Sequence, residues 1–71
     1  MKINDRLIDI LNAHKKEIIF ICPNGDPECV YKGYINDFDK NFIDITTPYV
    51  DNLYIGWEFV ESFYYNKREV K

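Results

Sequence analysis

The chain has 71 residues, of which 46% are hydrophobic and 17% aromatic, and a formal net charge of −3. This length allows one domain, and the apolar content excludes a disordered chain. The acidic charge opposes non-specific binding to nucleic acid, and no apolar run reaches the roughly 20 residues of a membrane-spanning helix. Because the N-terminus also lacks a signal-peptide core, we expect a soluble, cytoplasmic protein that does not bind membranes.

The first 16 residues predict one helix. Apolar side chains recur at the spacing of a single helical face, at Ile3, Leu7, Ile8 and Leu11. Asn4 suits the N-cap, because its side chain can accept a hydrogen bond from the first turn. The basic cluster at 14–16 is interpreted as the end of this helix, where cations suit the negative end of the dipole. A small anion-contact patch is the alternative for that cluster.

From residue 17 the chain changes to short runs of β-branched and aromatic residues between turn residues. These runs predict strands at 17–22, 29–38, 42–47, 52–55 and 58–64. Their regular spacing is typical of a small barrel. We therefore predict a mainly β fold in one domain, 1–71. The N-terminal helix (1–16) is followed by a five-stranded, strongly bent antiparallel sheet of the SH3-like or Sm-like small-barrel type (17–65), and a polar tail (66–71).

Glycine and cysteine positions add two expectations. Gly33 lies inside the second predicted strand, where a missing side chain marks a sharp bend or a bulge. Cys22 and Cys29 flank a turn, so a disulfide across a hairpin is one interpretation, and two free thiols in a reducing compartment are the favoured one. With His14 they fall short of the four ligands of a structural zinc site, so we expect no metal and no cofactor.

Two short motifs stand in the second and fourth predicted strands. Residues 33–39, GYINDFD, follow the pattern Gly-x-Ile-x-x-Phe-Asp, and residues 54–56, YIG, lie two strands further on. With the order of one helix and five strands, these motifs resemble the Sm-like family and its bacterial Hfq branch most closely. The first is the heart of the first Sm motif, and the second falls where Hfq carries Tyr-Lys-His. The resemblance covers nearly the whole chain.

The resemblance implies a homo-oligomeric ring, in which the fourth strand of one subunit pairs with the fifth strand of the next. It also implies that single-stranded RNA is bound near the pore. The corresponding RNA-binding positions in this sequence are Asp39, Lys40, Asn41, Ile55 and Gly56. The apolar end of the chain would form the subunit interface, with filling of the core as the alternative for the same residues: Tyr54, Trp57, Phe59, Val60, Phe63 and Tyr64.

The sequence departs from the family where bases are read. Asn41 stands in place of the second aromatic residue of the Hfq turn, Ile55 and Gly56 replace its Lys-His pair, and Ile43 replaces the asparagine of the first Sm motif. Two functions therefore stay open. One is a ring-forming RNA-binding or RNA-chaperone-type module with altered base-reading residues. The other is a homo-oligomeric assembly or protein-interaction module without nucleic acid, whose protein partner is unknown.

Catalysis is the third class of function, and we expect no enzyme and no catalytic residue. Asp37, Asp39, Asp44 and Asp51 offer carboxylates, but acid–base catalysis needs a cleft and a perturbed pKa. Aspartates in turns and strands are usually only solvated. The sequence also lacks a G-x-S-x-G elbow, a P-loop and an H-E-x-x-H motif.

Overall fold

A computed structural model describes residues 1–65 of the chain. Its elements are α1 (Asp5–Ala13), β1 (Ile18–Pro23), β2 (Tyr31–Phe38), β3 (Phe42–Thr46), β4 (Leu53–Gly56), the 3₁₀ helix η1 (Trp57–Phe59) and β5 (Val60–Tyr65). The predicted mainly β fold, with an N-terminal helix before a bent, five-stranded antiparallel sheet, is confirmed. The predicted polar tail at 66–71 lies outside the described residues.

Two strands begin two residues later than predicted, each for a local reason, and two others begin one residue later, at Ile18 and Leu53. The second strand begins at Tyr31 rather than at residue 29, because Cys29 still belongs to the preceding turn and donates its N–H to the Asp26 carbonyl at 3.2 Å. The last strand begins at Val60 rather than at residue 58. Residues 57–59 form η1 instead, which carries the chain from one edge of the sheet toward the other.

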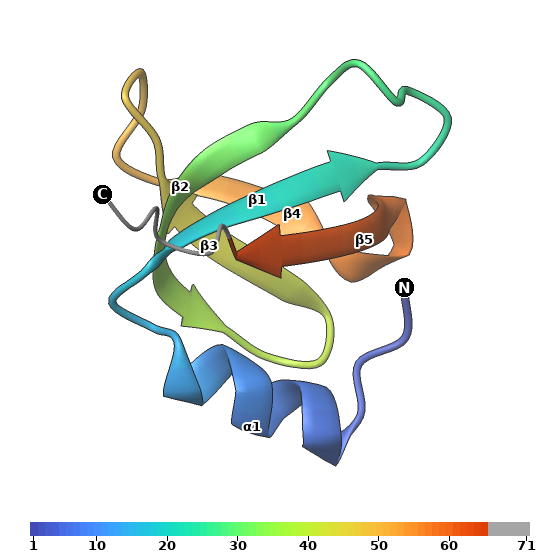
Figure 1. Ribbon diagram of the computed structural model, residues 1–71, viewed down its shortest axis with the longest axis vertical. Coiled ribbons are helices and arrows are strands. Elements are labelled where there is room, and N and C mark those ends of the chain that lie inside the picture. The colour runs from blue at the N-terminus through green and yellow to red at the C-terminus, as the bar shows by residue number, and fades with distance from the viewer. Residues whose placement is uncertain (66–71) are drawn as a thin grey trace, which may run out of the picture.

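Helix α1 lies at one end of the molecule, below the sheet in Figure 1. As predicted, Asn4 caps it: the Asn4 side-chain oxygen accepts the N–H of Leu7 at 2.9 Å. Leu11 on its inner face is completely buried in the core. No helix within residues 1–65 has the length and apolar character needed to cross a membrane.

The strands form one antiparallel sheet in the order β4-β3-β2-β1-β5. The sheet is bent but does not close on itself, so β4 and β5 are both edge strands (Figure 1). Its concave side and α1 enclose the core, which is built mainly of isoleucines: Ile3, Leu11, Ile19, Ile21, Ile35, Ile43, Ile45, Ile55, Trp57 and Val60. An open sheet leaves unpaired backbone groups along two strands, which is the property that matters most below.

Gly33 is needed where β2 and β3 approach each other most closely. A Cβ atom at this position would lie 2.2 Å from the Thr46 carbonyl oxygen and 3.0 Å from its carbonyl carbon. The register shift between β2 and β3 falls between Ile35 and Asp37, so the bulge predicted at Gly33 lies further along the strand. Gly33 therefore allows the backbones of β2 and β3 to come close together in the bent sheet, because it has no Cβ atom.

Candidate functional site

The turn between β2 and β3 carries three of the predicted RNA-binding residues. The Asp39 carboxylate accepts the N–H groups of Asn41 at 2.7 Å and Phe42 at 3.0 Å. The Asp39 N–H donates in turn to the Phe42 carbonyl at 3.0 Å. Asp39 thus builds the turn, as short polar side chains commonly do. The side chains of Lys40 and Asn41 remain exposed at its tip.

Trp57 of η1 fixes this turn from inside the molecule. Its indole Nε1–H donates to the Asp39 carbonyl at 2.8 Å, and its backbone N–H donates to the Asn41 carbonyl at 3.0 Å. The Trp57 side chain is only 2% exposed. Trp57 is therefore a buried residue that donates two hydrogen bonds to the turn. These bonds fix the position from which Lys40 and Asn41 face solvent.

A shallow hollow of about 550 Å³ lies beside the turn. Its walls include Lys40 and Asn41 from the turn, Lys2 and Ile3 from the N-terminal segment, and Glu58 from η1. The hollow therefore combines two lysines with one carboxylate and an apolar wall. This mixture is suited to a ligand with one anionic group and a flat or apolar part.

The two predicted RNA-binding residues of β4, Ile55 and Gly56, are less exposed than Lys40 and Asn41 of the turn. The Ile55 side chain is 8% exposed and belongs to the core, opposite Ile43 of β3. It is therefore not presented to a ligand, which corrects the prediction for its side chain. Gly56 is half-buried and pairs with Phe42, next to the turn. The structure thus brings Gly56 close to the turn and turns Ile55 away from solvent.

The predicted interface residues divide into two groups. Trp57 and Val60 are buried within the single chain, so the alternative of core filling describes them. Phe63 is half-buried, with its ring centroid 5.9 Å from that of Trp57. Three aromatic side chains on or beside the edge strands remain open to solvent: Tyr54 at 64%, Phe59 at 61% and Tyr64 at 45%. Exposed aromatics at open edges are typical of a surface that binds a partner.

The expectation that the four aspartates are only solvated was wrong for Asp44. This residue is the single buried charged residue among residues 1–65, and its carboxylate accepts from the side-chain amides of Asn52 at 3.0 Å and Asn36 at 3.3 Å. The Asn36 side-chain oxygen accepts in turn from Thr46 Oγ1 at 2.9 Å. This network ties the β3–β4 loop to the sheet, so the Asp44 carboxylate serves structure. The sequence signal was an aspartate within an apolar strand, with asparagines nearby.

Other chemistry-bearing residues do not gather into a second site in the described part of the chain. Among residues 1–65, no group of three or more His, Cys, Asp or Glu side chains is placed to hold a metal ion. Cys22 on β1 and Cys29 before β2 are both free thiols. The structure therefore agrees with the favoured interpretation, two free thiols, and not with a disulfide.

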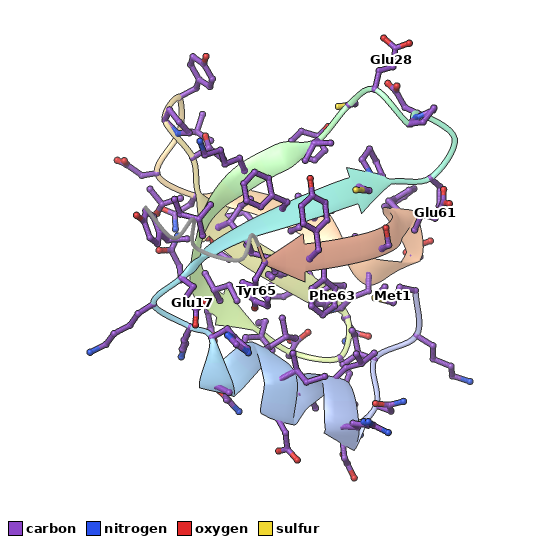
Figure 2. The ribbon with its side chains drawn as sticks, in the orientation of Figure 1. Met1, Glu17, Glu28, Glu61, Phe63 and Tyr65 are labelled. Atoms are coloured by element: carbon purple, nitrogen blue, oxygen red, sulfur yellow. The ribbon has the colours of Figure 1, made fainter. Side chains whose placement is uncertain are left out.

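Tyr65, the last residue of β5, packs its side chain against the end of α1. Its ring stacks on His14, with centroids 4.6 Å apart, and His14 Nδ1 lies 2.7 Å from a Glu17 carboxylate oxygen. The Tyr65 hydroxyl is buried and has no hydrogen-bond partner among residues 1–65. Burial, reinforced by the negative charge of Glu17, raises the pKa of Tyr65 to about 12 (Figure 2).

This shift predicts a loss of stability in alkali. Because folding raises the tyrosine pKa from 10.0 to about 12, its stabilising effect is complete below pH 10 and disappears as the pH rises toward 12. The wild type should therefore lose stability relative to Tyr65→Phe over that window. Urea unfolding of both proteins between pH 8 and pH 12 measures the difference. If the difference between the wild type and Tyr65→Phe stays constant from pH 8 to pH 12, the assigned shift is contradicted.

Three comparisons with known proteins, against family models, curated proteins and solved structures, each found no match. The fold and the site geometry therefore carry the functional argument alone.

Proposed function

We propose that this chain is a ring-forming module of the Sm-like type that binds single-stranded RNA at the β2–β3 turn. The observation that carries the proposal is the pair of open edges, β4 and β5, with an exposed aromatic on each. Sheets with open edges add strands from other chains unless the edge is blocked. When the two edges of a bent sheet pair head to tail, the assembly repeats by rotation, and it forms a ring where that rotation closes.

The backbone of β4 is prepared for such pairing. In an antiparallel ladder, residues alternate between bonding to the neighbouring strand and pointing their backbone groups away from it. The bond from the Trp57 N–H to the Asn41 carbonyl lies one residue beyond the Phe42–Gly56 pair. By that alternation, Tyr54 and Gly56 direct their N–H and C=O groups to the open edge. The edge therefore offers donors and acceptors in register for another strand.

The RNA part of the proposal rests on the exposed tip of the turn. Lys40 can neutralise a phosphate, and the Asn41 amide can donate to and accept from a base edge, the usual division between positioning and reading. Repetition around a ring would bring several such tips together, which raises the affinity of weak single contacts. The net charge of −3 per chain acts against a polyanion, so we expect binding that is modest and strongly weakened by salt.

Assembly is tested with Tyr54→Pro. Proline removes the N–H that faces the open edge while leaving the β3–β4 hydrogen bonds in place. At low concentration, wild-type protein should show a fixed multiple of the chain mass on light scattering, and further dilution should not reduce it. At the same concentration Tyr54→Pro should fall to the mass of a single folded chain, whereas Tyr54→Phe, which keeps the N–H, should assemble normally. A monomeric wild type contradicts the ring.

RNA binding is tested with a pair of matched charge reversals. Lys40→Glu changes the tip of the turn, and Arg6→Glu makes the same change in net charge on α1. Binding of fluorescent U-rich, A-rich and mixed RNA at low salt should be lost in Lys40→Glu and nearly retained in Arg6→Glu. Equal weakening by both variants would show general electrostatics. Absence of wild-type binding contradicts the RNA function.

An assembly module without nucleic acid is the second candidate. It is favoured by the burial of Ile55 and by the asparagine at position 41, because together they leave the turn without an aromatic or apolar group for stacking on a base. This candidate predicts the same fixed mass and the same effect of Tyr54→Pro, with no RNA bound. The RNA-binding experiment therefore separates the two functions.

A further inference from the structure

A continuous apolar groove lies at the end of the molecule away from α1. Two adjoining hollows of about 250 and 560 Å³ share the walls formed by Lys32, Thr47 and Pro48. The loops that follow β1 and β3 lie at this end in Figure 1. The remaining walls are mostly apolar or aromatic, and several are exposed, including Val30, Tyr31 and Tyr34. A groove of this kind on a small domain marks a binding surface.

The β3–β4 loop forms one rim of the groove and carries an aromatic side chain at its tip. Tyr49 is 91% exposed, the most exposed large hydrophobic side chain of the described residues. The loop that presents it is ordered by Thr47, whose Oγ1 accepts the N–H groups of Tyr49 and Val50, both at 3.1 Å. The Thr47 N–H also donates to the Val50 carbonyl at 2.9 Å. Tyr49 is therefore held out to solvent on a preorganised turn.

Charges of opposite sign accompany the groove and the tip. Lys32 is the single charged residue among those that line the two hollows. Asp51 follows the tip, and only its backbone carbonyl is engaged, by Asn36 and Thr46. Within residues 1–65 neither the Lys32 ammonium nor the Asp51 carboxylate forms an ion pair. Lys32 thus lines the groove without an ion pair to residues 1–65, its ammonium 5.9 Å from the centroid of the Phe20 ring, and Asp51 follows the projecting Tyr49.

We propose that two copies of this chain associate face to face, each placing its Tyr49 in the groove of the other. A two-fold arrangement makes the contact twice, so that Asp51 of each copy meets Lys32 of the other. Such self-complementarity needs both halves of a contact on one surface, and this end of the molecule has both. The proposal stands whether or not the β4 and β5 edges form a ring: single chains would form dimers, and rings would stack in pairs.

The size of the contact sets its strength. Two buried tyrosines account for about 300–500 Å², against the roughly 1,200–2,000 Å² of a standard interface. The apolar walls around the groove must therefore close over as well, and a single pair of chains should associate weakly. A paired assembly that dissociates on dilution is the expected behaviour. Rings would associate more strongly, because each ring carries several copies of the contact.

The test is a charge exchange measured by sedimentation over a range of concentrations. The wild type should double the mass of its smallest assembly as concentration rises. Lys32→Glu and Asp51→Lys should each weaken the doubling roughly tenfold or more, because each places like charges together. The double variant carrying both changes should restore it. Tyr49→Ser should abolish the doubling, whereas Tyr49→Phe, which keeps the aromatic side chain, should retain it. Arg6→Glu on α1 changes the net charge by the same amount outside both hollows and should also retain the doubling.

Absence of doubling at every concentration would overturn the proposal, and so would a double variant as weak as the single variants. If Tyr49→Ser doubles its mass like the wild type, another surface is responsible and the proposal is also overturned. The edge-strand variant Tyr54→Pro separates this contact from the ring. In that background the doubling should persist and should start from the mass of one chain.

Discussion

Replacing Gly33 by alanine should destabilise the protein by about 3 kcal/mol, because the new methyl group would overlap backbone atoms that have little room to move. The overlap is with the Thr46 carbonyl, 2.2 Å from the position of the added Cβ. Relief requires β2 and β3 to separate, which would disturb Ile35 and Ile45, two buried core residues that pair between these neighbouring strands. Most of the loss should appear as a lower midpoint of urea unfolding.

Gly56→Ala provides the matched control. There the added Cβ would lie 3.3 Å from the ring of Phe59, an exposed side chain that can rotate away, and the Gly56 backbone already has angles that alanine adopts. We expect a change within about 1 kcal/mol. If Gly33→Ala were as stable as Gly56→Ala, the close approach of β2 and β3 would not be a constraint on the fold.

Replacing Trp57 should cause the second large loss of stability. Two variants separate the contribution of its buried volume from that of its indole hydrogen bond. Trp57→Ala removes a buried aromatic and should cost about 3–5 kcal/mol. This is much of the stability of a small domain. Trp57→Phe keeps most of the apolar volume but removes the indole N–H that bonds the Asp39 carbonyl. Leaving that acceptor without its partner should cost about 1–3 kcal/mol.

The phenylalanine variant also tests the link between the core and the candidate site. Since Trp57 holds the β2–β3 turn, amide hydrogen exchange should increase at Asn41 and Phe42, whose N–H groups bond the Asp39 carboxylate. Exchange in α1 should change little beyond the global loss of stability. Unchanged protection at the turn would mean that the Asp39 carboxylate maintains the turn without the tryptophan.

Local patterns in the sequence predicted the elements of this fold well. Helical spacing and the Asn4 cap placed α1, and short β-branched runs placed five strands, because both signals depend on residues close together in the chain. The motif around Gly33 also lay where a glycine is required. Its reason, a carbonyl from β3, depends on pairing between strands and is not visible in the sequence.

The candidate site was less predictable, because exposure depends on how the whole sheet curves. Ile55 and Trp57 stand one residue to either side of Gly56, and sequence position suggested that both faced partners. The bent sheet and η1 place both side chains in the core. The apolar groove was not predicted, because most of its walls come from β2 and from the β3–β4 loop, which are distant in sequence. Tyr49 gave one usable signal, an aromatic residue directly after a Thr-Pro turn.

The β3–β4 loop is anchored at its base by side chains that lie outside its tip. Asn52 and Asn36 hold the Asp44 carboxylate, and Thr46 holds the Asp51 carbonyl, while residues 48–50 contribute no side-chain hydrogen bond to this network. The tip is therefore separable from folding: other short sequences can be exchanged there while the sheet stays intact. A protein built in this way can acquire a new binding specificity by changing three residues, and an engineer can use the same loop to graft one.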